Sequence, residues 1–214
     1  MYALETLTVD RAVARMRAPE TRELFSYWDR IRGMEEAPDR RDLEPFDISA
    51  CLGDILLVDT DHASNMIRLV GSRIATNMVR DLRGQSFDML WTPRDRPRVR
   101  ELLDYAIACP SGIQFDFTML TASGRSAAME GLLLPMRFGG PNIRRLIGIF
   151  TPMEQPWWVG AEAVNDLVLD RAAIFPTTPQ NALTPRFARS HPIFADATPR
   201  RRVRHLALYD GGLK

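Results

Sequence analysis

Residues 91–152 read WTPRDRPRVRELLDYAIACPSGIQFDFTMLTASGRSAAMEGLLLPMRFGGPNIRRLIGIFTP, and this stretch decides the fold. From Val99 to Ile107 the apolar residues recur with a period of about 3.6, which lines one face of a helix. Asp95 is predicted to cap this helix, and Pro97 then falls in the first turn, where no N–H is needed. The run CPSG at 109–112 predicts the helix end.

The period then changes to two, because apolar residues alternate with polar ones over 113–119, which predicts a half-buried strand. Turn residues at 121–124 and 139–142 separate it from a strand at about 125–138 and another at 145–150. A helix followed by consecutive antiparallel strands predicts an α+β fold whose sheet is covered on one face only.

Working outward toward the N-terminus, the runs at 54–59 and 66–70 predict a strand hairpin. A short helix capped by Ser72 is expected after it. Together with the three later strands, this hairpin predicts a five-stranded antiparallel sheet with flanking helices. A further short helix is expected over 8–17.

A second N-terminal helix is predicted over 21–33, which reads TRELFSYWDRIRG. Its apolar face either packs on its own domain or forms a partner surface. We expect it to pass a signal and to form a homodimer through Leu24, Phe25, Trp28 and Ile31.

Composition excludes several classes of protein. The 214 residues carry 28 Lys and Arg against 27 Asp and Glu, so no global field favours nucleic acid or an anionic membrane. Cys51 and Cys109 provide neither a disulfide framework nor a metal quartet. No signal peptide and no membrane-spanning run is evident, so we expect a soluble, cytoplasmic protein.

The order of these elements, together with particular motifs, resembles the PAS domain, and within it the bacterial subfamily of stand-alone single-domain proteins. The resemblance covers about residues 21–152. It is carried by YWDRIRG (27–33), Pro38 with RRDLEPFDI (40–48), ILLVD (55–59), RLVGSRI (68–74), RDLRGQSF (80–87), TPRDRPRV (92–99) and GRSAAMEGLLLPM (124–136).

The resemblance implies a sensor and protein-interaction module, since some PAS domains hold haem, flavin or a metabolite between sheet and helices. Haem needs an axial histidine from a helix of the pocket, whereas His62 is in a turn and His191 and His205 are in the tail. A photoactive flavin needs a cysteine on the helix after the second strand, where none occurs. We therefore expect neither cofactor and leave an unidentified small ligand open.

Candidate ligand-pocket residues are apolar side chains of the expected sheet and helices, with one arginine. They are Arg73, Met78, Trp91, Leu103, Phe115, Phe117, Met129 and Leu133. The alternative is that they fill the core, and that Arg73 pairs with Asp81 or Asp88 or contacts a carbonyl. Glu130, on a strand among apolar residues, is expected to face solvent or to meet an arginine.

No catalytic or metal-binding set emerges. Cys51, Asp59, Asp61 and His62 are close in sequence, but hairpin turns use Asp and His routinely, so we predict neither a metal site nor an enzyme.

The C-terminal region is expected to hold a helix over 162–173 and then a proline-rich, partly disordered segment. It also holds a basic cluster that can bind phosphates of nucleic acid, phospholipid or a cyclic dinucleotide. The cluster consists of Arg200, Arg201, Arg202 and Arg204. The cluster resembles the opening arginines of PilZ-type binders, but the rest of that domain is missing. Residues 206–209 alternate and can add an edge strand.

The sequence thus predicts a helical region at 1–33, a PAS-like sensor domain at 34–152 and an extension at 153–214. The predicted function is a non-enzymatic regulatory module of bacterial signalling that acts through protein–protein interaction. The alternative is a binder that uses the basic tail.

Overall fold

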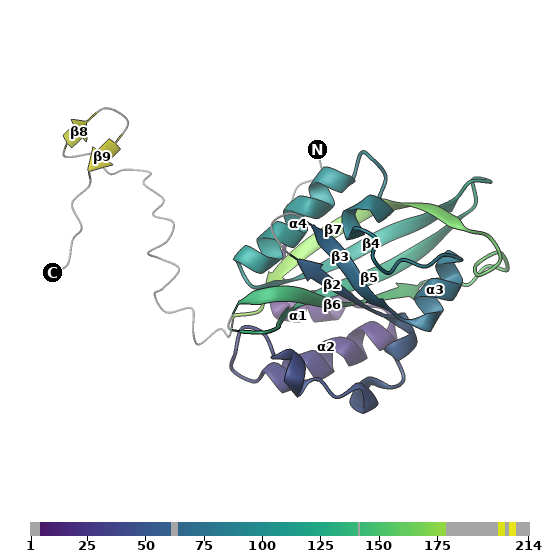
Figure 1. The fold of residues 1–214 in the computed structure, drawn as a ribbon, viewed down its shortest axis with the longest axis horizontal. Helices are drawn as coiled ribbons and strands as arrows, with labels where there is room; N and C mark the ends of the chain where they lie inside the picture. The colour runs from purple at the N-terminus through teal and green to yellow at the C-terminus, as the bar shows by residue number, and fades with distance from the viewer. Residues whose placement is uncertain (1–4, 61–63, 141, 179–200, 204–205, 209–214) are drawn as a thin grey trace. The chain divides into compact units, whose positions relative to one another are not determined.

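The structure, a computed structural model, describes residues 5–60, 64–140, 142–178, 201–203 and 206–208. Its principal sheet has seven strands in the order β1-β7-β4-β5-β6-β2-β3 (Figure 1). The strands are β1 (Glu5–Thr6), β2 (Ile55–Thr60), β3 (Asn65–Val70), β4 (Ser111–Thr121), β5 (Ser126–Arg137), β6 (Ile143–Pro152) and β7 (Val164–Pro176). All neighbours pair antiparallel except β1 and β7, which pair parallel.

Four α-helices flank this sheet within the described residues. They are α1 (Val9–Arg15), α2 (Pro19–Arg32), α3 (Ser72–Met78) and α4 (Arg96–Ala108). Short 3-10 helices η1 (Arg40–Asp42), η2 (Pro45–Ile48), η3 (Leu52–Asp54) and η4 (Phe87–Leu90) occupy the connections. None of the helices among the described residues is long and apolar enough to cross a membrane.

The α+β class and the five predicted strands are confirmed, with β4, β5, β6, β2 and β3 contiguous in the sheet. Helix α4 begins after Asp95 with a proline in its first turn, as predicted. However, Asp95 makes no side-chain cap. Its carboxylate instead accepts the Thr92 hydroxyl at 2.8 Å and the Leu169 backbone N–H at 3.0 Å, which ties the helix start to β7.

The predicted helix over 162–173 is wrong, because residues 164–173 belong to strand β7, which pairs with β4. Two bulges explain the misleading period. The pairing slips between Leu120 and Thr121 and again between Asp116 and Phe117, and each slip inserts one extra residue in β7. Val164 and Leu167 therefore share a face although they are three residues apart, which is also the spacing of a helix.

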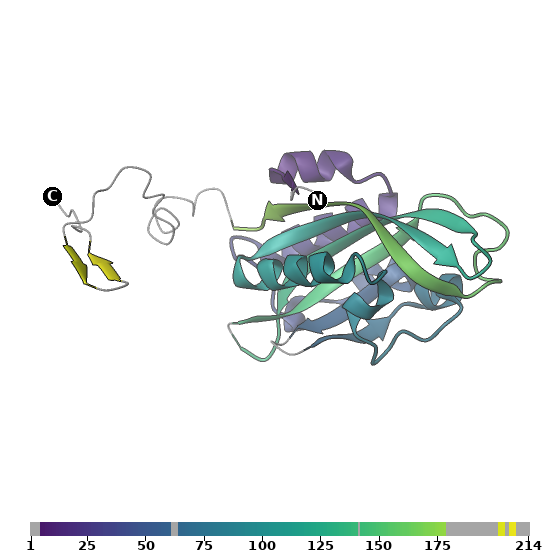
Figure 2. The same cartoon turned by 90° about the horizontal axis from the view of Figure 1, so that it is seen from above.

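The expectation that only one face of the sheet is covered is also wrong, since two buried clusters lie on opposite faces. One lies under α3, η4 and α4, and the other lies under α1, α2 and η2, as the helices on both sides of the sheet in Figures 1 and 2 show. The consecutive buried leucines of β5 explain this. Leu133 points into the first cluster, whereas Leu132 and Leu134 point into the second.

The chain forms two compact units, Met1–Pro179 and Gln180–Lys214, and the division expected at residues 33 and 152 stays a prediction. In the second unit the structure describes strands β8 (Arg201–Val203) and β9 (Leu206–Leu208), which pair antiparallel. Strand β9 matches the predicted alternating segment. The proline-rich residues 179–200 lie outside the described part of the chain.

The pairing of β4 with β7 can be tested at Gly112. A Cβ atom there would lie 2.1 Å from the ring of Phe175, which is fully buried and packs on Phe25 with ring centroids 6.0 Å apart. Because this ring has no free space, Gly112→Ala is expected to lower the free energy of unfolding by about 1–3 kcal/mol in urea titrations. In a Phe175→Leu background the same change should cost much less. Equal costs in both backgrounds would contradict the pairing.

Candidate functional site

The interior under α4 is an aromatic cluster built around Trp91. The ring centroid of Trp91 lies 5.3 Å from that of Phe117, 5.5 Å from that of Phe115 and 6.0 Å from that of Phe87. Phe150 extends the cluster, with its centroid 4.7 Å from that of Phe117. These distances are those of tilted and edge-to-face aromatic pairs, so the rings form one packed unit.

The backbone on both sides of Trp91 is held in place. Its N–H donates to the Asp88 carbonyl at 3.3 Å, and the N–H of Thr92 donates to the Leu167 carbonyl of β7 at 2.9 Å. The side chain itself is fully buried, yet its indole Nε1 has no hydrogen-bond partner among the described residues. Buried indole N–H groups are normally bonded, so this donor is available to an acceptor placed in the cluster.

The predicted pocket residues lie together, apart from Arg73. The other seven are buried members of the first cluster: Met78, Trp91, Leu103, Phe115, Phe117, Met129 and Leu133. They come from α3, the end of η4, α4, β4 and β5, so the topology brings distant segments to one place. Their side chains contact one another, and ligand binding by them stays a prediction.

Arg73 has a different environment. Its guanidinium pairs with the buried carboxylate of Asp54 at 2.5 Å and donates to the Ala50 carbonyl at 2.9 Å. The predicted carbonyl contact is therefore confirmed, whereas the two predicted acidic partners bind other arginines: Asp81 pairs with Arg83 and Asp88 with Arg100. Arg73 lines an open pocket beside the start of α2, away from the aromatic cluster.

On the opposite face, Glu130 of β5 joins the sheet to the two N-terminal helices. Its side chain is 0% exposed, and its two carboxylate oxygens accept the backbone N–H groups of Arg17 at 2.8 Å and Ala18 at 3.2 Å. Ala18 is the residue at the start of α2 and has no side-chain cap. The carboxylate therefore lies at the positive end of the helix dipole and takes the place of a local cap.

The side chain of Arg17 adds to this link between the sheet and the two N-terminal helices. Its guanidinium pairs with Asp116 of β4 at 2.6 Å and reaches the Glu130 carboxylate through Nε at 3.4 Å. Asp116 and Glu130 are directly opposed across the β4–β5 ladder, so two acids sit side by side. One arginine thus bridges two carboxylates that would otherwise repel each other, and the prediction that Glu130 meets an arginine is confirmed.

The apolar face of α2 packs on the sheet of its own chain. Leu24, Phe25 and Trp28 are buried, Ile31 is half-buried against the same cluster, and the Trp28 indole donates to the Pro135 carbonyl at 2.9 Å. Of the two interpretations, packing on its own domain therefore describes this face. A second copy can use these four residues only by exchanging α2 between chains, and the predicted dimer through them stays a prediction.

The sequence-adjacent group around Cys51 does not assemble within the described residues. Burial raises the pKa of the Cys51 thiol to about 11, and Asp59 pairs with Arg145 and Arg68. Asp61 and His62 lie outside the described part of the chain. Among the residues that are described, no group of three or more His, Cys, Asp or Glu is placed to hold a metal ion.

For the basic tail, the structure describes only the backbone of two arginines. Arg201 and Arg202 belong to β8, opposite Leu208 and Ala207 of β9, whereas Arg200 and Arg204 lie outside the described residues. Phosphate binding by this tail stays a prediction.

Sequence reasoning did not single out Arg17 and Asp116. Asp116 is one of the polar residues that alternate with apolar ones over 113–119, and this pattern by itself predicts only a half-buried strand. The sequence signal that was missed is that two successive strands, β4 and β5, each carry an acid. Two acids directly opposite each other in a sheet repel, so a cation is required nearby.

Comparison with known proteins agrees with this architecture. The family model described as the PAS domain matches residues 16–151, and the chain belongs to this family. PAS domains are generally signal-sensing modules. No curated protein matches the chain.

The solved structures that match part of the chain are distant in sequence. The PAS domain of a protein from Colwellia psychrerythraea is 18% identical, with a TM-score of 0.41 over 51% of this chain and 98% of that one. The LOV domain of a blue-light activated histidine kinase from Erythrobacter litoralis is 16% identical, with a TM-score of 0.39 over 48% and 96%. A light-oxygen-voltage domain studied with a flavin analogue is 13% identical, with a TM-score of 0.42 over 50% and 82%.

The contacts of Glu130 with Arg17 and Ala18 can be tested by Glu130→Gln. The amide retains one acceptor oxygen but loses the charge, so one backbone N–H and the Arg17 guanidinium lose their anionic partner. We expect the free energy of unfolding in urea to fall by about 2–4 kcal/mol, with faster amide exchange in α1 and α2. The exposed Glu154→Gln is the control and should change stability by less than about 0.5 kcal/mol. Similar losses for both variants would rule out a special role for the buried acid.

Proposed function

We propose that this chain is a non-enzymatic sensor and regulatory module of bacterial signalling that acts in the cytoplasm. In this proposal a small ligand binds in the interior beneath α4 and a protein partner reads the result. Membership of the PAS family supports the sensing role, since that is what such domains generally do.

The observation that carries the sensing role is the orphaned indole N–H of Trp91. It lies at the centre of the aromatic cluster and has no acceptor among the described residues. A buried donor without a partner costs about 1–3 kcal/mol, which a ligand carrying one acceptor atom would recover. The surrounding rings of Phe115 and Phe117 suit a flat, largely apolar molecule.

The output of the module is proposed to leave through α1 and α2. Glu130 and Asp116 belong to strands whose opposite faces carry the aromatic cluster, and Arg17 links both acids to the chain between the two helices. A ligand that shifts β4 or β5 therefore shifts the anchor of α2 directly. The proposed ligand and the start of α2 then both contact the same two strands. A protein partner would detect the shift at the start of α2.

The proposal gives Cys51 no catalytic role. A thiol whose pKa is about 11 is protonated at neutral pH, and the nucleophile in cysteine chemistry is the thiolate. Its Sγ donates to the Ile48 carbonyl, and the residue belongs to the cluster under α1 and α2, on the face away from Trp91.

The interior ligand can be tested by Trp91→Phe, which removes the N–H and keeps an aromatic ring. Protein purified gently from the native host is expected to release a compound in denaturing mass spectrometry. The Trp91→Phe variant should carry at least about tenfold less of it, because it lacks the donor. Circular dichroism checks that the variant is folded.

Phe87→Leu is the matched control, since it alters a ring that packs on Trp91 without touching the donor. It should lower the occupancy less than Trp91→Phe does. If the wild-type protein releases no compound and a metabolite panel produces no thermal shift, the interior-ligand proposal fails.

The state of Cys51 predicts its reactivity. At pH 8, iodoacetamide should modify Cys51 far more slowly than Cys109, because Cys51 is buried and its thiol stays protonated until the pH approaches about 11, whereas Cys109 is partly exposed. Peptide mass spectrometry over a time course measures both rates. Faster labelling of Cys51 would contradict the proposed inert role.

A homodimer is a further part of the proposal, since PAS domains commonly mediate dimerisation and protein interaction. Light scattering measures the mass. If the dimer forms by exchange of α2, replacing Ile31 with Glu should lower the free energy of unfolding but leave the dimer fraction of the folded protein unchanged, because the same contact holds α2 in the monomer and in the exchanged dimer.

A further inference from the structure

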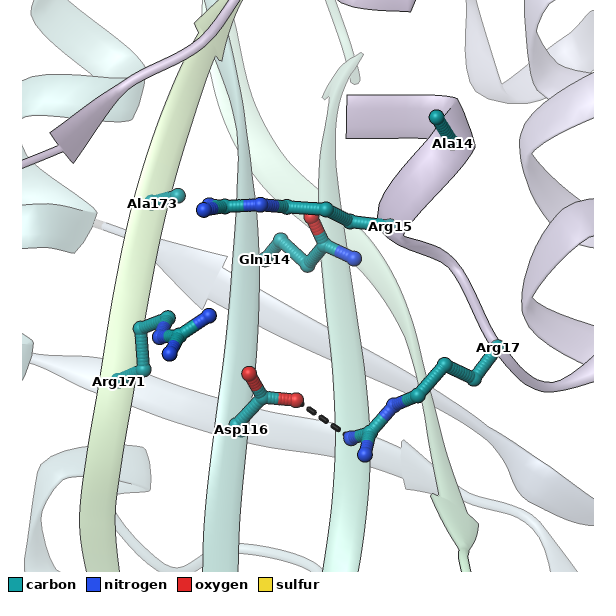
Figure 3. A pocket seen from close by; sticks show the side chains of 7 residues that line it. All are labelled: Ala14, Arg15, Arg17, Gln114, Asp116, Arg171 and Ala173. Atoms are coloured by element: carbon teal, nitrogen blue, oxygen red, sulfur yellow. Dashed lines mark hydrogen bonds and ion pairs between the residues drawn. The ribbon is translucent and has the colours of Figure 1, made fainter. Parts of the chain in front are cut away.

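A pocket lies on the opposite face of the sheet from Trp91, between the end of α1 and strands β4 and β7. Its volume is about 320 Å³, and its polar lining residues are Arg15, Arg17, Gln114, Asp116 and Arg171 (Figure 3). Gln114 and Asp116 alternate with Ile113, Phe115 and Phe117, which point into the aromatic cluster. The pocket is therefore separate from the interior where the sensor ligand is proposed.

Gln114 is the unusual residue of this pocket. It is only 6% exposed, yet its buried side-chain oxygen has no hydrogen-bond partner among the described residues. Such an acceptor carries a desolvation cost until a donor reaches it. At the wall of a cavity, such an oxygen can accept a hydrogen bond from water or from a molecule bound there.

Arg171 provides the complementary group. Its guanidinium forms no hydrogen bond or ion pair with any described residue, and Figure 3 shows it directed from β7 toward Gln114 and Asp116. The two other arginines already have partners, since Arg15 binds Glu5 at 2.8 Å and Arg17 binds Asp116 at 2.6 Å. Arg171 is thus the cation of this pocket that is available for an anion.

The charges around the pocket define the kind of anion. Three arginines and Asp116 line it, so the lining carries a net charge of +3 − 1 = +2. Glu5 pairs with Arg15 and Glu130 pairs with Arg17, and these two carboxylates reduce the positive potential of the pocket further. A carboxylate facing Arg171 suits this balance, whereas a phosphate dianion would be repelled by Asp116 unless a donor separated the two.

We propose that this pocket binds a small carboxylate that carries a hydroxyl or ammonium group close to the carboxylate. The carboxylate pairs with Arg171, and the neighbouring donor faces the Gln114 oxygen and Asp116. The volume suits a molecule of a few carbon atoms. Because Arg17 also holds Glu130 and Asp116, such a ligand would contact the same arginine that anchors α2.

The test uses three probes of similar size in isothermal titration calorimetry with the full chain: L-lactate, L-alanine and propionate. Lactate and alanine carry the extra donor and propionate does not. We expect lactate or alanine to bind at least about fivefold more tightly than propionate, because only they can donate to Gln114.

Two variants assign the binding to this pocket. Arg171→Gln should weaken lactate and alanine at least about tenfold by removing the cation, and Gln114→Leu should abolish their advantage over propionate. Arg83→Gln is the control, because Arg83 is an exposed arginine paired with Asp81 outside this pocket, and it should leave affinity within about twofold.

Absence of saturable binding for all three probes would overturn the proposal. Equal affinity for the three, or affinities that Arg171→Gln and Gln114→Leu leave unchanged, would overturn it as well. These outcomes are independent of the interior site, since Trp91→Phe changes the aromatic cluster on the other face and should leave the calorimetric affinities unchanged.

Discussion

The whole structure depends on burial of both faces of β4 and β5. These two central strands carry apolar side chains on one face for the aromatic cluster, and on the other face they carry Leu132 and Leu134 together with the acids Asp116 and Glu130. A strand covered on both faces must compensate for every charge that it buries. The arrangement of α1, α2 and Arg17 follows from that requirement.

Glu130 illustrates how the compensation works. Burying an isolated carboxylate costs several kcal/mol, and two backbone N–H groups, the start of a helix and one guanidinium together replace the lost water. The same contacts orient α2 on the sheet. One buried acid therefore serves both as an electrostatic requirement and as the mechanical link between sheet and helices.

The two orphaned polar groups divide between the two faces. The Trp91 indole offers a donor inside an apolar cluster, whereas Gln114 offers an acceptor beside Arg171 in a charged pocket. Their surroundings select different molecules, because an aromatic interior rejects charge and an arginine-lined pocket requires it. In the proposed module both sites include side chains of β4, and both act on the segment that contains Arg17.

The sequence by itself determined the class, five of the strands, helix α4 and the family, because alternation, helical spacing and turn residues are local properties of the chain. Its prediction for 162–173 was wrong because two bulges gave a strand the spacing of a helix, and a bulge depends on the partner strand. Only the tertiary structure decided that the second face of the sheet is covered and that Glu130 meets Arg17, 113 residues away. It also decided that Gln114 and Arg171 share a pocket, since contacts between distant segments are set by packing and carry no local pattern.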